Sequence, residues 1–117
     1  MGSIISALPR KSPINVNMTS PQADMVRDII GSNKVVIFSK SYCPYCTMAK
    51  EQFRKLSIAA HVVELDSRND AEEIQNILEE ITGCRTVPRC FINGKFIGGG
   101  TDVKKMYEQG TLQKFFT

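Results

Sequence analysis

The stretch that decides the fold runs from residue 35 to residue 46 and reads VVIFSKSYCPYC. Its first four residues, Val35–Phe38, are apolar and mostly β-branched, which favours a strand with both faces covered. Proline at position 44 fits the first turn of a helix, where its missing N–H costs no hydrogen bond. We therefore predict a buried strand over residues 34–39 that passes into a helix over residues 44–57.

Periodicity on either side of this stretch predicts the remaining elements. Ser20 followed by proline predicts a helix start, and Gly31 predicts its end. Ile81 belongs to the apolar stripe of a later helix, and Thr101 is expected to cap another. Asn93 and Gly94, between two short apolar runs, are typical of a two-residue β-hairpin turn. The predicted helices span residues 20–31, 69–82, from 101 onward and 111–116, and the predicted strands span 61–65, 90–92 and 96–97.

The order of these elements is α-β-α-β-α-β-β-α. A helix joins the first two strands, so they should be parallel, with a right-handed crossover. The hairpin should add two antiparallel strands. We therefore predict an α/β fold with a four-stranded mixed sheet flanked by helices.

Length and composition exclude several classes of protein. The chain has 117 residues, enough for one domain with its own core. A net charge of +3, with both signs scattered, does not favour nucleic-acid binding. No apolar stretch is long enough to span a membrane, and we expect no secretory signal. Four cysteines then favour a reducing compartment, where a cysteine pair is redox-active or binds metal.

Residues 1–19 are expected to form a flexible tail, and residues 20–117 the folded domain. Gly2, with Ser6 four residues later, matches an N-myristoylation signal, which would attach the protein to a membrane. Arg10 and Lys11 in an acid-free segment would alternatively suit a weak mitochondrial presequence. An unmodified tail is the third alternative. We expect a cytoplasmic protein, with mitochondrial or membrane-associated location as alternatives.

Cys43-Pro44-Tyr45-Cys46 carries the chemistry. A cysteine at a helix N-terminus meets unpaired N–H groups and the positive end of the dipole, which together stabilise a thiolate. Lys40 adds positive charge three residues upstream. Cys46 lies one turn along and should be more covered. Cys43 is therefore the predicted nucleophile and Cys46 the predicted resolving thiol.

Zinc binding is the alternative use of a C-x-x-C motif, and it needs further ligands. The only histidine, His61, begins a predicted strand, and Cys84 and Cys90 are six residues apart. We expect no metal site.

Two later segments supply binding groups. Proline at position 88 fixes an extended Thr86–Pro88 segment. A cis bond there would expose the Val87 backbone as a strand edge, although residue-level reasoning favours trans. Gly98–Gly100 place flexible backbone before a helix, where N–H groups can hold a carboxylate and Asp102 can pair with an ammonium group.

Together these segments resemble the dithiol glutaredoxins, most of all the vertebrate glutaredoxin-2 group. The resemblance covers about Ser20–Phe116. It rests on residues 35–50, on TGCRTVPR at 82–89 and on FINGKFIGG at 91–99. It implies a thioredoxin fold and a cis proline at position 88.

The resemblance also implies a groove for glutathione. Lys40 and Gln75 would hold its glycine carboxylate, and Val87 would pair with its cysteinyl residue. The implied glutathione-binding residues are Lys40, Tyr45, Gln75, Arg85, Thr86, Val87, Pro88, Gly100, Thr101 and Asp102. Glutathione would be the reducing co-substrate. The implied partners are disulfide-containing or glutathionylated proteins, and we expect a monomer.

The chain departs from the family pattern at two positions. Relatives that share a [2Fe–2S] cluster between subunits usually have serine where this chain has Pro44, so we expect no cluster, and a cluster carrier is the alternative function. Many dithiol members have a cysteine where this chain has Gly100. Cys90 is expected to be a buried thiol, and Cys84 to be either regulatory or incidental. A thioredoxin is a further rival, although this chain lacks the usual tryptophan.

Overall fold

The computed structural model describes residues 16–117. The proposed targeting signals, at Gly2 and at Arg10–Lys11, lie outside the described residues. Val16 and Met18 already pack against the core. The Ser20 N–H donates to the Asn17 carbonyl at 3.3 Å. Ordered structure among the described residues therefore begins a few residues ahead of position 20.

The four strands form one mixed sheet, as predicted. They are β2 (Val35–Ser39), β3 (His61–Glu64), β4 (Arg89–Ile92) and β5 (Lys95–Gly98), in the order β3-β2-β4-β5. β2 runs parallel to β3 and antiparallel to β4, and β4 runs antiparallel to β5. β2 is therefore central, which explains why all five of its residues are buried.

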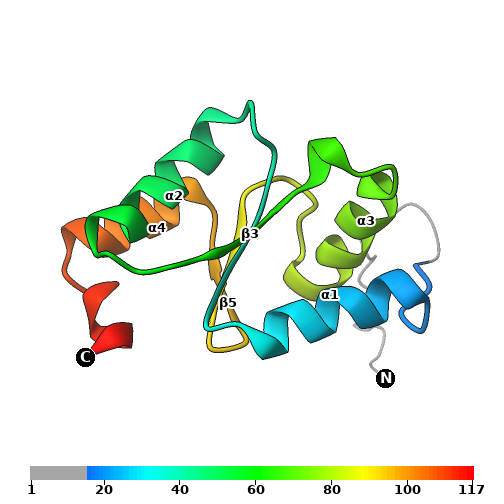
Figure 1. Ribbon diagram of the computed structural model, residues 1–117, viewed down its shortest axis with the longest axis horizontal. Helices are drawn as coiled ribbons and strands as arrows, with labels where there is room; N and C mark the ends of the chain where they lie inside the picture. Colours follow the sequence, from blue (N-terminus) through cyan, green and yellow to red (C-terminus); the bar gives the residue numbers. More distant parts are fainter. Residues whose placement is uncertain (1–15) are drawn as a thin grey trace, which may run out of the picture.

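Helices cover both faces of this sheet (Figure 1). α1 (Pro21–Ser32) packs beside α3 (Ala71–Thr82), and α2 (Pro44–Lys55) packs beside α4 (Gly100–Glu108). Two short 3₁₀ helices follow β3 and α4, η1 at Leu65–Ser67 and η2 at Gln113–Phe116. None of the helices between residues 16 and 117 is both long enough and apolar enough to cross a bilayer.

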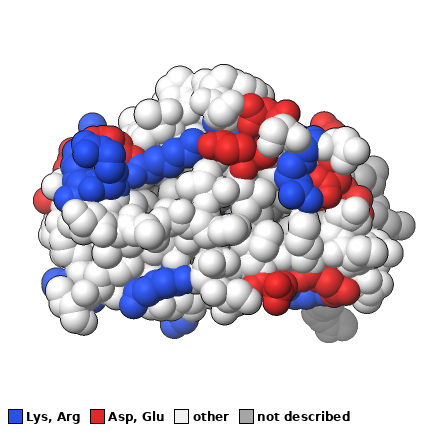
Figure 2. All heavy atoms as spheres, viewed as in Figure 1, with Lys and Arg blue, Asp and Glu red and all other residues white. Residues whose placement is uncertain are grey.

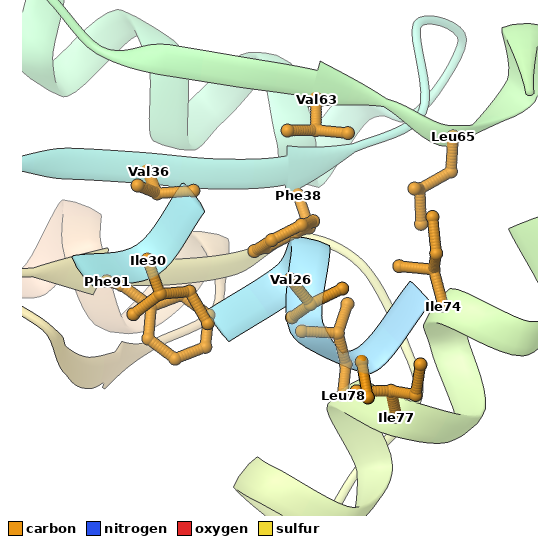
Figure 3. Packing of buried hydrophobic residues seen from close by; sticks show 11 residues of the cluster. Val26, Ile30, Val36, Phe38, Val63, Leu65, Ile74, Ile77, Leu78 and Phe91 are labelled. Atoms are coloured by element: carbon orange, nitrogen blue, oxygen red, sulfur yellow. The ribbon is translucent and has the colours of Figure 1, made fainter. Parts of the chain in front are cut away.

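Successive side chains of β2 point to opposite faces of the sheet, which divides the core into two layers. Val36 and Phe38 face α1 and α3, and the Phe38 ring meets Phe91 edge to face, with ring centroids 5.9 Å apart. Figure 3 shows this layer, where the aliphatic side chains of α1 and α3 meet the sheet. Val35 and Ile37 face α2 and α4. The predicted double coverage of this strand is confirmed.

The β4–β5 hairpin has the predicted two-residue turn. Asn93 and Gly94 both have positive φ, 53° and 80°. This is the conformation that an Asn-Gly pair adopts at low cost, and it matches the twist of the flanking strands. The turn fixes the register in which Phe91 faces Phe96.

Three local predictions from the sequence were wrong. Gly31 does not end α1, which continues to Ser32. Thr101 is not a cap, because α4 begins one residue earlier and its N-cap is Gly99. Ile81 is not part of the buried stripe of α3, because it is 38% exposed whereas Ile77 and Leu78 are fully buried.

Charged side chains of both signs are neighbours on the face shown in Figure 2. Elsewhere in the described residues, charged side chains form ion pairs, such as Lys50 Nζ with Glu64 Oε2 at 2.6 Å and Arg68 Nε with Asp70 Oδ1 at 2.8 Å. The side chains of both pairs are between 17% and 34% exposed, and ion pairs that stay in contact with solvent contribute little to stability. This face has no continuous surface of one charge.

Candidate active site

Cys43 is the N-cap residue of α2, directly after the loop that leaves β2. Pro44 occupies the first helical position, as predicted. The Cys46 N–H donates to Cys43 Sγ at 3.3 Å. A helix N-terminus places unpaired donors and a partial positive charge beside the sulfur, and both stabilise a thiolate.

Cys46 lies in a different environment from Cys43. It is fully buried, whereas Cys43 is partly exposed. Burial, followed by the hydrogen bond with Cys43, raises the pKa of the Cys46 thiol to about 11. The Lys40 N–H donates to Cys46 Sγ at 3.5 Å. At neutral pH, Cys46 is therefore a protonated thiol behind the accessible sulfur.

Asp66 holds the loop that presents Cys43, which sequence reasoning missed. The Ser41 N–H donates to Asp66 Oδ1 at 3.0 Å, and the Ser41 hydroxyl donates to Asp66 Oδ2. Hydrogen bonds from the Ser41 side chain and backbone hold the pKa of this carboxyl below its usual range. Within the loop, the Cys43 N–H donates to the Lys40 carbonyl at 3.0 Å. Only the folded chain brings residue 66 beside residue 41, so spacing gave no signal.

The Val87–Pro88 peptide bond is cis. The resemblance implied this isomer, and the residue-level preference for trans was wrong. Cys43 Sγ lies 3.9 Å from the Val87 carbonyl oxygen, across 44 residues of sequence. The Thr86–Pro88 backbone therefore faces the nucleophile.

A groove of about 370 Å³ opens beside this pair. It is lined by Tyr45, Thr86, Val87, Pro88, Arg89, Gly99, Gly100, Thr101 and Asp102. Seven of these nine were among the glutathione-binding residues that the resemblance implied; Arg89 and Gly99 were not. The groove therefore joins three segments: the start of α2, the cis-proline loop and the start of α4.

Gly100 lets α4 approach α2 closely. A Cβ atom at this position would lie 2.4 Å from the Tyr45 carbonyl oxygen, far inside van der Waals contact. The start of α4 is also fixed by Asp102, whose Oδ2 accepts the Gly99 N–H at 2.9 Å. The N–H groups of the first turn of α4 are thus presented to the groove.

Lys40, Gln75 and Arg85 do not line this groove. Gln75 is buried, and its Nε2 donates to the Arg85 carbonyl at 3.0 Å. The Arg85 guanidinium pairs with Glu72 at 3.2 Å. These contacts tie the loop after α3 to that helix, and the Lys40 backbone contacts both cysteines of the motif.

Arg89 is a groove residue that the sequence analysis missed. Its Nε donates to the Pro88 carbonyl at 3.1 Å, and its Nη1 donates to Thr82 Oγ1 at 3.4 Å. The guanidinium carbon lies 4.8 Å from the centroid of the Phe96 ring. Its position directly after Pro88 was the available signal.

The other two cysteines also differ. Burial raises the pKa of the Cys90 thiol to about 12. Cys84 is partly exposed, and a hydrogen bond with the Thr86 hydroxyl, at 3.1 Å, lowers the pKa of its thiol. Among the described residues all four cysteines are free. No group of three or more His, Cys, Asp or Glu side chains in that part of the chain could hold a metal ion.

Known proteins are similar to this chain in sequence and in fold. The glutaredoxin family model matches residues 35–97. Glutaredoxin-C4 of Arabidopsis thaliana is 53% identical over 103 residues, which cover 88% of this chain and 76% of that protein. The human protein named glutaredoxin-2, mitochondrial, is 44% identical over 96 residues, or 82% of this chain and 58% of that one.

A solved structure of a buckwheat glutaredoxin–glutathione complex matches with a TM-score of 0.76 and 39% identity. The match covers 83% of this chain and 92% of that one. The mixed sheet with helices on both faces is the thioredoxin fold of these structures. The chain therefore belongs to the glutaredoxin family of oxidoreductases.

Proposed function

We propose that this protein is a glutathione-dependent thiol–disulfide oxidoreductase. It would reduce protein disulfides and protein–glutathione mixed disulfides, with Cys43 as nucleophile and Cys46 as resolving thiol. The observation that carries the proposal is the position of Cys43 Sγ. It accepts a helix N-terminal N–H at 3.3 Å and lies 3.9 Å from the Val87 carbonyl at the mouth of the groove.

The groove has complementary groups for a tripeptide with two carboxylates and one ammonium group. The Val87 backbone would pair with the cysteinyl residue as a neighbouring strand does. The N–H groups at the start of α4, at Gly100 and Thr101, would hold the γ-glutamyl carboxylate. Asp102 is exposed and would pair with the ammonium group. The buckwheat relative was solved as a complex with glutathione, which supports glutathione as the ligand.

The glycine carboxylate is assigned to Lys40 and Gln75, with Tyr45 on the groove wall. One N–H of the Gln75 amide is engaged with the Arg85 carbonyl, so only its second N–H is available to a ligand. Arg85 and Thr86 flank this end. Tyr45 is 56% exposed, which leaves its ring free to cover a bound ligand.

For a glutathionylated protein, the reaction needs only one cysteine. The Cys43 thiolate attacks the glutathione sulfur, the mixed disulfide breaks, and the protein thiolate leaves and takes up a proton. The thiolate of a second glutathione then attacks the glutathione sulfur bound to Cys43. Oxidised glutathione leaves, and the electron pair returns to Cys43.

For a protein disulfide, both cysteines take part. Cys43 forms a mixed disulfide with one substrate sulfur and releases the other as a thiolate. Cys46 loses its proton and attacks Cys43 Sγ, which forms the Cys43–Cys46 disulfide and frees the substrate. Two glutathione molecules then reduce this disulfide.

The test is glutathione-dependent turnover of β-hydroxyethyl disulfide, together with reduction of a protein disulfide. Cys43→Ser should lower both rates at least about a hundredfold, because the nucleophile is lost. Cys46→Ser should keep deglutathionylation and lose protein-disulfide reduction. Cys84→Ser is the matched control and should change neither. A Cys46→Ser protein without deglutathionylation activity, or a wild type recharged by thioredoxin reductase and not by glutathione, would contradict the proposal.

We further propose that the protein acts as a monomer in a reducing compartment, the cytoplasm or the mitochondrion. A glutathione pool there would keep the cysteines reduced. Intact mass of the protein from its own cell would distinguish myristoylation of Gly2 from removal of an N-terminal segment.

A further inference from the structure

Ser39 is a buried residue that the proposed mechanism leaves without a role. It is the last residue of β2, and alternation puts its side chain on the same face as Val35 and Ile37, towards α2 and α4. Ser39 is 0% exposed, and its hydroxyl has no hydrogen-bond partner. A buried hydroxyl without a hydrogen-bond partner lowers the stability of the folded protein, so a serine at this position needs an explanation.

The Ser39 side chain lies on the α2 side of β2, and Cys46 is a buried residue in the first turn of α2. Lys40, the residue after Ser39, donates its N–H to Cys46 Sγ at 3.5 Å, so this end of β2 is in contact with the sulfur. In the reduced protein, the hydroxyl and the sulfur do not meet the geometry of a hydrogen bond, yet Ser39 acts to lower the pKa of Cys46. A serine hydroxyl can rotate towards an anion that forms next to it.

The titratable groups that face Cys46 do not help it to ionise. Cys43, from the start of α2, raises the pKa of Cys46. Cys90, from β4, is a buried neighbour whose own pKa is raised in part by Cys46. The charges of Arg89 and Asp102 act on Cys90, in opposite directions. A donor that favours the Cys46 anion must therefore be neutral, and Ser39 and the Lys40 N–H are the two on this side.

We propose that Ser39 is a positioning residue for the resolving step, in which its hydroxyl donates a hydrogen bond to the Cys46 thiolate. The proposal deepens the proposed function and rests on it. In this step the Cys46 proton passes to solvent, and the Cys46 thiolate attacks Cys43 Sγ. The bond between Cys43 and its partner sulfur breaks, the Cys43–Cys46 bond forms, and the electron pair leaves with the partner thiolate.

The expected effect separates Ser39 from a residue that only fills space. Loss of one hydrogen bond to a charged sulfur should move the pH profile of the resolving step up by about one unit in Ser39→Ala. A more basic thiolate is also a better nucleophile, and on a logarithmic scale this offsets about half of the loss in the resolving rate. The resolving rate at pH 7 should therefore fall only about threefold, and attack by Cys43 should not change.

The experiment uses the full chain with Cys84→Ser, so that an exposed thiol does not react. Reduced protein is mixed with excess 2,2′-dithiodipyridine in a stopped-flow instrument. Cys43 releases the first thiopyridone in a step whose rate depends on reagent concentration. Cys46 releases the second in an intramolecular step, whose rate is measured from pH 6 to pH 11.

Two further variants keep the test informative. Ser39→Thr retains the hydroxyl and should restore the wild-type profile. Ile37→Val removes one methylene group from the same face of β2 and should lower the unfolding temperature without a shift of the profile. The expected result is a shift in Ser39→Ala alone.

A Ser39→Ala profile that coincides with the wild type would overturn the proposal. So would equal slowing of both releases, or a Ser39→Thr protein that behaves like Ser39→Ala. Because the reagent contains no glutathione, these outcomes do not depend on glutathione use. A wild type that resolves normally yet ignores glutathione would instead contradict the proposed function.

Discussion

Two hollows of similar size lie at different parts of this molecule. The active-site groove has a volume of about 370 Å³, and a second hollow of about 440 Å³ is lined by Gly31, Ser32, Asn33, Lys34, Asn93 and Gly94. In the second, polar groups are paired within the fold: Asn33 Nδ2 donates to the Ile29 carbonyl, and the Asn93 N–H donates to the Lys34 carbonyl. In the first, a helix N-terminus, an extended backbone and an accessible sulfur face outward. The candidate active site therefore differs from the second hollow in the hydrogen-bonding groups and the sulfur that face outward, and not in its volume.

The largest expected effect is a difference in reactivity between Cys43 and Cys46, the two cysteines at the active-site groove. At pH 8, iodoacetamide should label Cys43 and leave Cys46 unlabelled, because Cys46 is fully buried. With its pKa raised to about 11, about one Cys46 thiol in a thousand is ionised at pH 8. Raising the pH towards 11 increases the anionic fraction and should increase labelling, as measured by peptide mass spectrometry. Equal labelling of both cysteines at pH 8 would contradict the asymmetry.

A matched pair of glycines tests the two hollows directly. Gly100→Ala should destabilise the protein by about 1–3 kcal/mol, because backbone meets the new methyl group. It should also raise the KM for glutathione about tenfold, the equivalent of one weakened charge-assisted hydrogen bond. Gly31→Ala, with no atom within 4 Å of the new Cβ, should instead stabilise α1 by about 0.5–1 kcal/mol.

Chemical denaturation and glutathione kinetics on both variants supply the measurement. Stable folding of Gly100→Ala with an unchanged KM would show that the close approach of α2 and α4 has no part in binding.

The smallest expected effect on turnover is at the second hollow. Asn93→Ala should lower stability by about 1 kcal/mol, because alanine is disfavoured at the positive φ of this turn. Turnover with glutathione should stay unchanged, since the turn contributes no group to the groove. A loss of turnover in excess of the loss of folded protein would mean that the two ends of the sheet are coupled.

The sequence predicted most of this fold because its signals are local. The buried strand at 35–39, the Asn93-Gly94 turn and the proline at the start of α2 each carry their own signal within a few residues. Helix ends were less predictable. Threonine is a common N-cap residue, yet Thr101 is not the cap of α4. Gly99 is the N-cap, because the Asp102 carboxylate accepts the N–H of that residue.

The site was predictable where the resemblance or the chemistry marked it, as at Cys43 and Asp102. Arg89, Asp66 and Ser39 were missed for other reasons. Asp66 acts through a contact with Ser41, 25 residues away along the chain, which no spacing reports, and Ser39 is hidden in a strand. Arg89 was signalled only by its position directly after Pro88. The cis bond before Pro88 also depends on tertiary context, which the resemblance supplied and residue preferences did not.

The separation of 44 positions between Cys43 and Val87 has a consequence for synthesis on the ribosome. The chain emerges from its N-terminal end, so both cysteines of the motif leave the exit tunnel well before β4, which pairs with β2 and brings the Val87 backbone into place. A nascent chain therefore carries its reactive sulfur before it has a pocket to select a substrate. Most of the residues that line the groove belong to the C-terminal half of the chain. A truncated chain that ends ahead of Arg89 would therefore have both thiols of the motif without the groove beside them.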